Sequence, residues 1–599
     1  MEDIIKGLKI LSLEAKDIYL SNLNDALNGY DIKYKSGAKA GQFLEKKFCN
    51  TLDFSLELIE LKNLYHKKIS KKNFTLEVNQ HLATLQVINL TYHYALKEFN
   101  PIGKNRYIKL GAKQEDLVFQ DSVCIKEGQL IGIIINEKID HPIDEKRLGK
   151  CFQIIDGKYQ IATIPTVMTT AMLREWTYSH GFVVNQTKYC RYKRSSGSSR
   201  VGKCLFINAA LYPFIHKWEL CGLKVNENTE SDLAAWEAYI SLPLSSIIDT
   251  IKIELHQILV INDYESVFKD EVIEVYDKKQ HLMVKEKTAK IKNSIWDGQT
   301  LLDHSLFGSY SHKGMLLLRN RFFKSACFNA NIQEWFKDQH ITDISQLNGF
   351  TLAKDIQQIK MITTHSSIKY LKFGTLKNWL KHVDPIFGIV KHDKPTHYFN
   401  GSYVQTNYQL LNTIQLTFEE VFQLVKPSLD YLDLIRQDAS VLRFHIHYNL
   451  KTEKWDTPAQ NKNEIIYKLL GLNQKFEKTK LYAEFRQDLV TSYIKNLRAG
   501  HLLISGTYAT LLGNPIEMLQ ESIGQFKGIS ILKKQNVCSY FFPEGKLLCC
   551  RSPHICAGNI YLPHNIRHPM IEKYINMTKE IIVLNSIEEN VLQRLNGAD

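Results

Sequence analysis

The chain has 599 residues, of which 44% are hydrophobic and 23% charged, and these ordinary globular values exclude a mainly disordered chain. A chain of this length predicts roughly three to five domains. Lysine and arginine number 76 against 63 aspartates and glutamates, so the net charge is 76 − 63 = +13. That excess permits a polyanionic partner without requiring one.

The sequence also bears on location. It contains no run of about 18 apolar residues of the kind that spans a membrane, and its N-terminus carries acids where a secretory signal carries bases. We therefore expect no membrane partner. The eleven cysteines include no Cys-x-x-Cys pair, which argues against structural zinc and favours buried thiols, among them Cys327, Cys549 and Cys550. A cytoplasmic location is the resulting expectation.

The first hundred residues are predicted to form a helical region, because Ile4, Ile5, Leu8 and Leu11 fall at helical spacing. From about residue 101 short β-branched runs replace this pattern. The runs at 129–136 and 161–165 are apolar and of strand length. We therefore expect residues 101–290 to form a mixed platform of strands and helices.

One segment of this platform is a candidate nucleic-acid contact. Residues 188–203 (KYCRYKRSSGSSRVGK) mix aromatic and basic side chains and end in a Gly/Ser loop. Cations interleaved with aromatic rings can bind a nucleic-acid strand, so Arg191, Lys193, Arg194 and Arg200 are candidate ligands. A solvated surface hairpin is the alternative, and composition alone favours it.

The remaining chain alternates between strands and helices. Residues 291–400 contain short strands, one of which delivers Arg319 and Lys324 at its end. Residues 401–500 are predicted to be helical, with apolar side chains between 410 and 425 on one core-facing stripe and a second helix over 481–499. The last hundred residues return to short strands, predicted at 546–551 and at 580–584.

Five short segments follow one another along the second half of the chain. Taken singly they carry little information, since an Asp-Gly pair is a common turn and a lone lysine is normally a surface residue. Their order is the informative feature. The segments are Trp296-Asp297-Gly298, the run from Arg319 to Ser325, the run from His365 to Tyr370, Asn407-Tyr408-Gln409, and the run from Arg551 to Asn559.

In this order the segments resemble the catalytic half of eukaryotic-type RNA-dependent RNA polymerases, and more closely their bacterial and phage relatives, which are single-chain RNA polymerases with two barrels. In that family an early Asp-Gly turn precedes a strand with arginine, four residues, then Lys-Gly. Arg319 and Lys324 keep this spacing, with Ser325 in place of the glycine.

The other segments match with further replacements. The run His365-Ser-Ser-Ile-Lys369-Tyr keeps the spacing of the family's Pro-Ser-x-x-Lys-Phe element, and Lys372 lies just beyond it. Asn407-Tyr-Gln resembles an Asn-Arg-Gln helix start, with tyrosine for arginine. Arg551 opens a turn similar to Arg-x-Pro-x-x-x-x-Gly-Asp, which ends here in Asn559.

The resemblance implies an α+β fold with two double-psi β-barrels linked by helices, behind a helical and strand-rich N-terminal half. It places the first barrel at 291–400, a helical connector at 401–500 and the second barrel at 501–599. It also implies that cations of the first barrel hold nucleotide phosphates and that Arg551 faces the nucleic acid. The catalytic candidates among these cations are Arg319, Lys324, Lys369 and Lys372.

The second barrel of this family carries an Asp-x-Asp-x-Asp loop that binds Mg²⁺. The final residues Asn596-Gly-Ala-Asp599 resemble the start of that loop, so Asp599 is the catalytic and metal-binding candidate. The resemblance implies two further aspartates beyond these 599 residues, supplied by a longer chain or by a second chain. We therefore expect an incomplete second barrel, and a chain that by itself polymerises nothing.

The function implied is nucleotidyl transfer by two-metal phosphoryl chemistry, in which RNA is made on a template. The expected partners are the template, nascent RNA and nucleoside triphosphates, with Mg²⁺ as cofactor. An RNA and a DNA template are not distinguished, because contacts to the 2′-hydroxyl leave no local sequence pattern. The alternatives are a nucleic-acid-binding protein that retains the polymerase fold without catalysis, and an unrelated soluble basic protein.

Overall fold

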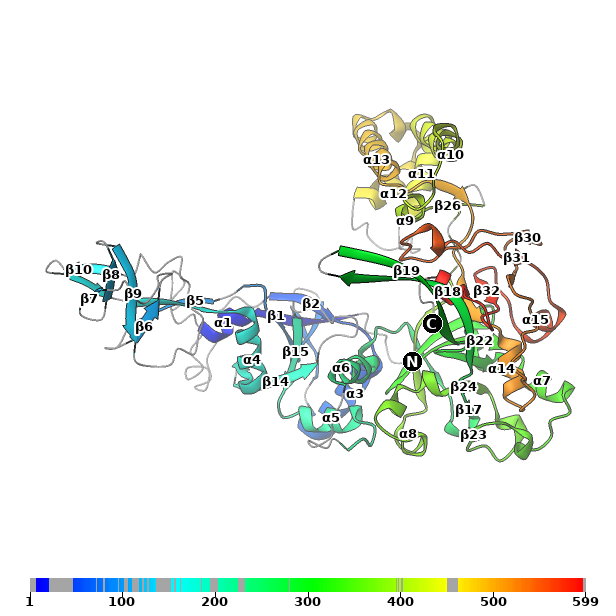
Figure 1. Ribbon diagram of the computed structural model, residues 1–599, viewed down its shortest axis with the longest axis horizontal. Helices are drawn as coiled ribbons and strands as arrows, with labels where there is room; N and C mark the ends of the chain where they lie inside the picture. Colours follow the sequence, from blue (N-terminus) through cyan, green and yellow to red (C-terminus); the bar gives the residue numbers. More distant parts are fainter. Residues whose placement is uncertain are drawn as a thin grey trace. The chain divides into compact units, whose positions relative to one another are not determined.

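The computed structural model describes residues 7–20, 47–193, 203–224, 232–278, 281–449 and 462–595. Within these ranges it leaves out residues 72, 79–80, 95, 185, 395, 397 and 400–401, and between residues 102 and 162 it describes only the strands. The chain divides into two compact units (Figure 1). Unit 1 comprises Met1–Thr250, Arg319–Phe323 and Lys372–Val390, and unit 2 comprises Ile251–Leu318, Lys324–Leu371 and Lys391–Asp599.

Unit 1 is built on a seven-stranded sheet. In spatial order its strands are β13 (Phe182–Val184), β14 (Thr187–Lys193), β15 (Lys203–Asn208), β4 (His81–Thr91), β1 (Leu8–Glu14) and β2 (Lys47–Leu52), and β3 (Leu76–Val78) also pairs with β4. The strands β1 and β4 run parallel, and the other pairs are antiparallel. The helices of this unit are α1 (Ala15–Leu20), α3 (Leu56–Leu64), α4 (Thr170–His180), α5 (Tyr212–Glu219), α6 (Leu233–Ile240) and α8 (Leu376–His382).

Further strands of unit 1 form three small sheets. The first has the order β6 (Arg106–Lys109), β9 (Gln129–Ile135), β8 (Val123–Lys126) and β7 (Val118–Gln120). Two pairs complete the set, β10 (Phe152–Ile155) with β11 (Lys158–Ile161), and β12 (Thr163–Met168) with β5 (Leu96–Pro101). The strand predicted over 129–136 is thereby confirmed, and the run at 161–165 is shared between β11 and β12.

The prediction of a helical region over residues 1–100 is wrong. Leu8 and Leu11 both lie in β1, and the described part of this region contributes five strands against two helices and one π-helical turn, Tyr65–Ile69. Four of the seven residues of β1, Leu8, Ile10, Leu11 and Leu13, are buried, and the other three are partly buried. A strand covered on both faces carries no clean period of two, so its apolar spacing can imitate a helix.

Unit 2 contains two curled half-barrel sheets in a mixed α/β arrangement. Within unit 2 the first sheet runs in the order β21 (Met315–Asn320), β22 (Phe323–Ala330), β20 (Gln299–Asp303), β24 (Met361–Thr364), β17 (Ile258–Ile261) and β23 (Phe350–Thr351). The chain crosses between the units within β16 (Asp249–Lys252), β21, β22 and β25 (Ile386–His392), and between Leu371 and Lys372. The first barrel was predicted to start at residue 291. The sheet begins earlier, because β17 belongs to it and precedes the long hairpin that separates β17 from β20 in the sequence.

The second sheet has the order β28 (Thr510–Gly513), β32 (Ile581–Leu584), β29 (Asn536–Ser539), β31 (His564–Asn565) and β30 (Gly545–Lys546). The strand predicted at 580–584 is confirmed as β32, and all four of its residues are buried. The strand predicted over 546–551 is wrong, since β30 ends at Lys546 and beyond it only Cys549 pairs, in an isolated bridge to Tyr561.

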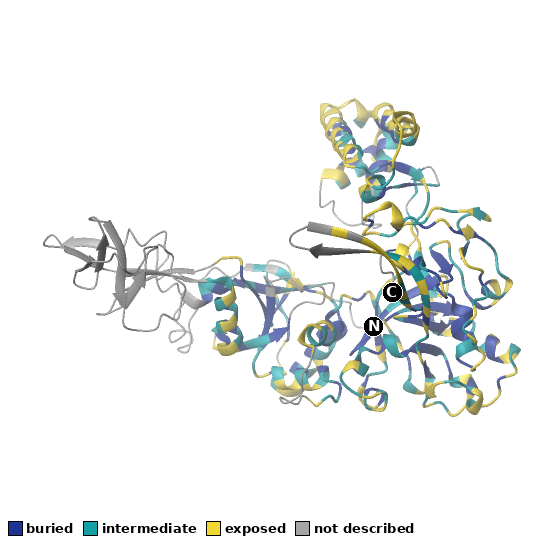
Figure 2. Ribbon diagram, in the orientation of Figure 1, coloured by how far each residue is buried: buried dark blue, intermediate teal, exposed yellow. Residues whose placement is uncertain are grey.

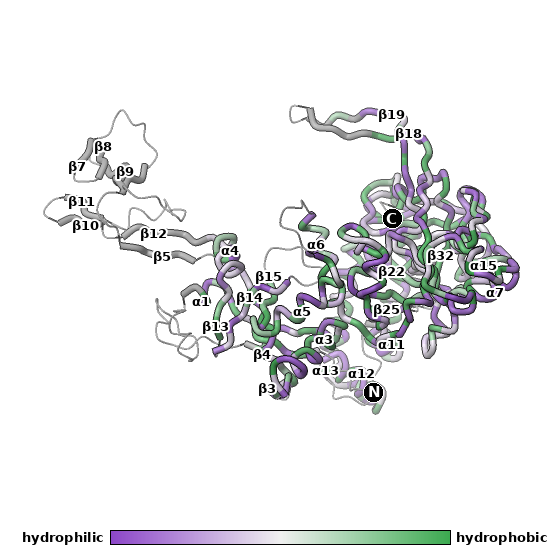
Figure 3. Tube along the Cα trace, turned by 90° about the horizontal axis from the view of Figure 1, so that it is seen from below, coloured by the Kyte–Doolittle hydropathy of each residue, from purple (hydrophilic) through white to green (hydrophobic). Residues whose placement is uncertain are grey.

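The two sheets of unit 2 share one hydrophobic core. Leu301 and Phe328 of the first sheet belong to the same buried cluster as Leu512 and Val583 of the second. The dark-blue strands of this part of the chain in Figure 2 mark that core, and Figure 3 shows hydrophobic and hydrophilic stretches alternating along it. The helices packed in this region are α7 (Ile332–Asp338), α14 (Pro515–Glu521), α15 (Pro569–Tyr574) and α16 (Val591–Arg594).

Residues 401–500 are mainly helical, as predicted. The helices are α9 (Tyr408–Leu411), α10 (Phe418–Gln437), α11 (Ala439–Asn449), α12 (Lys462–Leu472) and α13 (Lys480–Arg498), and Figure 1 shows α10 to α13 gathered into a bundle. The bundle has its own core, which includes Leu432, Ile446 and Tyr493. Its ends are tied by the strand pair β26 (Tyr403–Gln405) and β27 (Leu503–Ser505).

The prediction that the apolar side chains between 410 and 425 face the core is wrong for the second half of that stretch. Phe418 is 88% exposed and Phe422 is 58% exposed. The buried residues of α10 are Ser428, Leu432 and Ile435, so only the C-terminal turns of this helix pack against the bundle. Helical spacing showed that the side chains share a face, but not which turns of the helix are covered.

The hairpin of β18 (Glu265–Lys278) and β19 (His281–Ser294) is the longest strand pair of unit 2, and it stands out in Figures 1 and 3. Its base is held by residues near the end of the chain. Asn293 Nδ2 donates to the carbonyls of Ser586 and Glu589 at 2.8 and 2.7 Å, and Gln593 Nε2 donates to Asn293 Oδ1 at 2.8 Å.

Across the part of the chain that the structure describes, no helix combines the length and apolar character needed to cross a lipid bilayer.

Candidate functional site

Three of the five segments meet at one end of the first sheet of unit 2. Gly298 lies in the turn before β20, Ser325 in β22, and Ser366 in a 3-10 turn that follows β24. The Ser325 hydroxyl donates to the Gly298 carbonyl at 2.8 Å, and the Gly298 amide donates to Ser366 Oγ at 3.1 Å. Since β20 pairs with both β22 and β24, the sheet itself brings the segments together.

Hydrogen bonds between buried hydroxyl groups hold these three segments together. Thr300 Oγ1 lies 2.7 Å from both Ser325 Oγ and Thr363 Oγ1, and Ser367 Oγ lies 3.1 Å from Ser325 Oγ. Each of these side chains is at most 1% exposed. Buried hydroxyls that satisfy one another fix the backbone around them, because each would cost free energy if it lost its partner. We call Thr300, Ser325, Thr363 and Ser367 the hydroxyl cluster.

The glycine of the Asp-Gly turn has a conformational role. Gly298 has φ of +65°, a left-handed value that side-chain-bearing residues rarely adopt. Space for a side chain is not the obstacle, since a Cβ at this position would have the Lys324 carbonyl oxygen as its nearest neighbour, at 4.0 Å. The left-handed turn directs the chain from Asp297 into β20, next to the hydroxyl cluster.

Two of the predicted phosphate ligands emerge beside the hydroxyl cluster. Lys324 immediately precedes Ser325 in β22 and is exposed. Lys369 follows Ser367 by two positions, and its Nζ lies 3.7 Å from Asp297 Oδ1, with 17% of its side chain exposed. Lysine ammonium groups bind phosphate oxygens as point charges. The backbone of Lys324 and the side chain of Lys369 therefore both lie next to the Asp297-Gly298 turn.

The other two predicted cations belong to unit 1. Arg319 is 9% exposed, which leaves little of it for a ligand. Lys372 is exposed, and its Nζ lies 5.2 Å from the centre of the Tyr239 ring. The expectation that the four cations together hold nucleotide phosphates therefore involves residues of both units, and it stays a prediction.

The remaining two segments form a second junction in unit 2. Asn407 Nδ2 donates to Ser552 Oγ at 3.2 Å, and Ser552 Oγ donates to Gln409 Oε1 at 2.9 Å. The His554 amide donates to the same Gln409 oxygen at 3.2 Å. The start of α9 and the turn over 551–559 are thus held together by side chains of the two matching segments.

This turn also holds the residues that lead to the predicted metal loop. Arg551 Nη1 donates to the Leu595 carbonyl at 3.3 Å, and Asn559 Nδ2 donates to the Arg594 carbonyl at 3.0 Å. An aspartate in place of Asn559 would lack the amide hydrogens for the second bond.

Three predicted site residues lie outside the described residues. They are Asp599, the candidate metal ligand, and Arg194 and Arg200 of the 188–203 segment. Within the residues that the structure does describe, no group of three or more histidines, cysteines, aspartates and glutamates is arranged to hold a metal ion. Because Asp599 lies outside these residues, the expected magnesium site stays a prediction.

The prediction that Lys193 contacts nucleic acid is wrong. Lys193 is 2% exposed, and its Nζ lies 2.5 Å from both Glu57 Oε2 and Glu219 Oε1. Burial raises the pKa of Glu57 to about 7 in spite of the opposing charge of Lys193. The pKa of Lys193 is also raised, because the two carboxylates outweigh the effect of burial. This buried ion cluster is a structural element of unit 1.

Arg191, the other described candidate ligand of that segment, also has partners within the protein. Its Nη2 pairs with Glu237, and its guanidinium lies over the Tyr178 ring at 4.6 Å from the ring centre. About a third of its side chain remains exposed, so a phosphate contact is compatible with this position. Its role in nucleic-acid binding stays a prediction.

The hydroxyl cluster was not predicted from the sequence, and one of the three thiols predicted to be buried is exposed. Serine and threonine recur throughout the chain, so nothing distinguished these four from surface residues before the strand pairing was known. Cys327 is buried, as predicted, and Cys549 is half-buried, but Cys550 is exposed. It lies beyond the end of β30, where no sheet covers it.

The comparisons with known proteins add no assignment. A scan of the sequence against models of protein families finds no match, and a search among curated proteins finds no relative.

Proposed function

We propose that this chain is part of a nucleotidyltransferase of the two-barrel RNA polymerase class, which binds nucleoside triphosphates at Lys324 and Lys369, beside the hydroxyl cluster, and makes RNA on a nucleic-acid template. The observation that carries the proposal is the meeting of Gly298, Ser325 and Ser366, which come from three segments matched in order to that family. The two curled half-barrel sheets are compatible with double-psi barrels, and that finer identity is part of the proposal.

The proposed chemistry assigns a role to each junction. Lys324 and Lys369 neutralise the triphosphate as it binds, and the hydroxyl cluster keeps their backbone in place. The turn over 551–559 supports the chain as far as Leu595, from which Asp599 is four residues away. Mg²⁺ would supply charge neutralisation and orientation of the reacting oxygens, with Asp599 as one of its ligands.

Binding of a nucleoside triphosphate by the 599-residue chain tests the proposal. We expect a fluorescent ATP analogue to bind, inorganic tripolyphosphate to compete, and Lys324→Ala to weaken binding by about five- to thirtyfold, since it removes a charge-assisted contact at an exposed site. The measurement is fluorescence anisotropy at low salt.

The matched control is Lys337→Ala, which removes an exposed lysine of α7 in the same unit and should leave binding unchanged. Equal affinity in the wild type and Lys324→Ala would remove Lys324 from the site. Binding of nucleic acid without any binding of the triphosphate would favour the non-catalytic alternative.

A further inference from the structure

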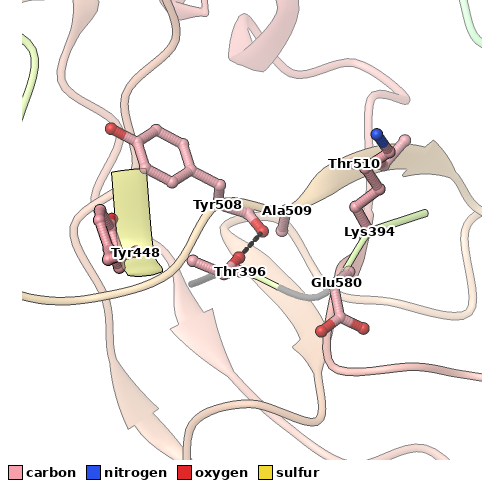
Figure 4. A pocket seen from close by; sticks show the side chains of 7 residues that line it. All are labelled: Lys394, Thr396, Tyr448, Tyr508, Ala509, Thr510 and Glu580. Carbon is pink, nitrogen blue, oxygen red and sulfur yellow. Dashed lines mark hydrogen bonds between the residues drawn. The ribbon is translucent and has the colours of Figure 1, made fainter. Parts of the chain in front are cut away.

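A cavity of about 380 Å³ lies in unit 2 (Figure 4). Its lining combines aromatic, hydroxyl and charged side chains. Those that matter for its chemistry are Lys394, Thr396, Tyr448, Tyr508, Thr510 and Glu580. A volume of this size lies within the range of protein pockets that take small ligands. None of these residues belongs to the hydroxyl cluster or to the turn over 551–559.

The aromatic end of the cavity is held in a fixed arrangement. Tyr508 is 61% exposed, yet its hydroxyl donates to the Gln405 carbonyl at 2.6 Å and its own carbonyl accepts a hydrogen bond from Thr396 Oγ1 at 3.1 Å. The Tyr448 ring packs against Phe399, with 4.0 Å between ring centres. An exposed ring whose orientation is fixed is a platform on which a flat group can stack at little entropic cost.

The other end of the cavity carries charge. Figure 4 shows Lys394, Thr510 and Glu580 at the end away from Tyr448. Lys394 is exposed, and none of the carboxylates that the structure describes forms an ion pair with it. An ammonium group without a protein carboxylate is suited to an anionic ligand, and Glu580 and Thr510 can accept hydrogen bonds from hydroxyl or amino groups.

Tyr448 and Tyr508 thus lie toward one end of the cavity and Lys394 toward the other (Figure 4). Aromatic rings combined with a cation are the arrangement with which proteins hold a single nucleic-acid strand.

We propose that this cavity binds an unpaired nucleotide of a nucleic-acid single strand, with the base stacked on Tyr508 and a phosphate paired with Lys394. Glu580 and Thr510 then face the sugar and the edge of the base. The net charge of +13 favours a polyanion over an aromatic peptide as the occupant. The inference goes beyond the proposed nucleotidyl transfer and is independent of it, since it uses none of those residues and requires no catalysis.

The test is the binding of a fluorescein-labelled single-stranded RNA octamer to the 599-residue chain. Stacking on one aromatic ring predicts that Tyr508→Ala weakens binding by about five- to a hundredfold, whereas Tyr508→Phe keeps the ring and stays within about threefold of the wild type. Lys394→Gln should lower the slope of log K against log salt by about 0.7, the contribution of one phosphate on a single strand.

Two controls make the result specific. Phe418→Ala removes a more exposed aromatic ring of α10 in the same unit and should leave the affinity unchanged. An octamer with abasic sites should bind the wild type and Tyr508→Ala alike. Photo-crosslinking of a 5-iodouracil octamer should label the peptide that contains Tyr508. Equal octamer affinity of the wild type and Tyr508→Ala, or crosslinks confined to other peptides, would overturn the proposal.

Discussion

Replacing Lys193 with methionine is expected to lower the stability of unit 1 by about 3–5 kcal/mol. The substitution leaves Glu57 and Glu219 buried without the ammonium group that both contact at 2.5 Å. The free energy is best followed by hydrogen exchange of peptides from β14 and α3 over a urea series, because these elements carry Lys193 and Glu57. Faster exchange should appear in these peptides first.

The cost of Lys193→Met should grow with pH. Burial already raises the pKa of Glu57, and without Lys193 it rises further. Lys193 holds the pKa of Glu219 below its ordinary value in spite of burial, so without Lys193 burial raises that pKa as well, and both carboxyls tend to stay protonated in the folded chain. A raised folded pKa contributes stability that is present below the unfolded pKa and lost as pH rises. The variant should therefore approach the wild type near pH 4 and fall furthest behind it near pH 8.

Two further variants separate this cluster from a general effect of charge removal. Lys188→Met removes an exposed lysine from the same strand and should change stability by no more than about 0.5 kcal/mol. Combining Lys193→Met with Glu57→Gln and Glu219→Gln should recover much of the loss, since no buried charge then lacks a partner. If Lys193→Met were as stable as Lys188→Met, the buried ion cluster would not exist in solution.

Lys324→Ala is expected to reduce template-directed incorporation of ribonucleotides by about a hundredfold or more, in the longest reading frame that contains these 599 residues. A cation that binds the triphosphate more tightly as its charge develops contributes to the reaction rate beyond binding. The assay follows labelled nucleotides on a primed single-stranded template with Mg²⁺. Lys369→Ala should show a similar loss.

The control for this assay is again Lys337→Ala, which should incorporate at the wild-type rate. Template affinity should be equal in all variants, so that a loss of incorporation cannot be assigned to loss of template. Full activity of both Lys324→Ala and Lys369→Ala would contradict the assignment of the phosphate site.

Parts of the fold were predictable because the relevant information is local. The helices α10 and α13 follow from apolar spacing over about 20 residues, and β32 from an apolar β-branched run. The region before residue 100 was not predictable in this way. There β1 is a central strand with a parallel partner, β4, about 70 residues later, and only that pairing explains its apolar pattern.

The site shows the same division. The order of the five segments indicated which parts of the chain should meet, and Gly298, Ser325 and Ser366 do meet. The role of Lys193 could not be foreseen, because the carboxylates that surround it come from α3 and α5, far from β14 in the sequence. A strand of alternating cations and aromatic residues looks the same whether it faces solvent or buried acids.

The most direct measurement of the central claim is chemical labelling of the triphosphate site in the 599-residue chain. An acyl-phosphate derivative of ATP transfers its acyl group to lysine amines next to the terminal phosphate, and peptide mapping identifies them. We predict labelling at Lys324 and Lys369 that excess ATP prevents, with Lys337 labelled only weakly and without protection. Labelling spread over surface lysines, or protected labelling at lysines outside the hydroxyl-cluster junction, would contradict the account.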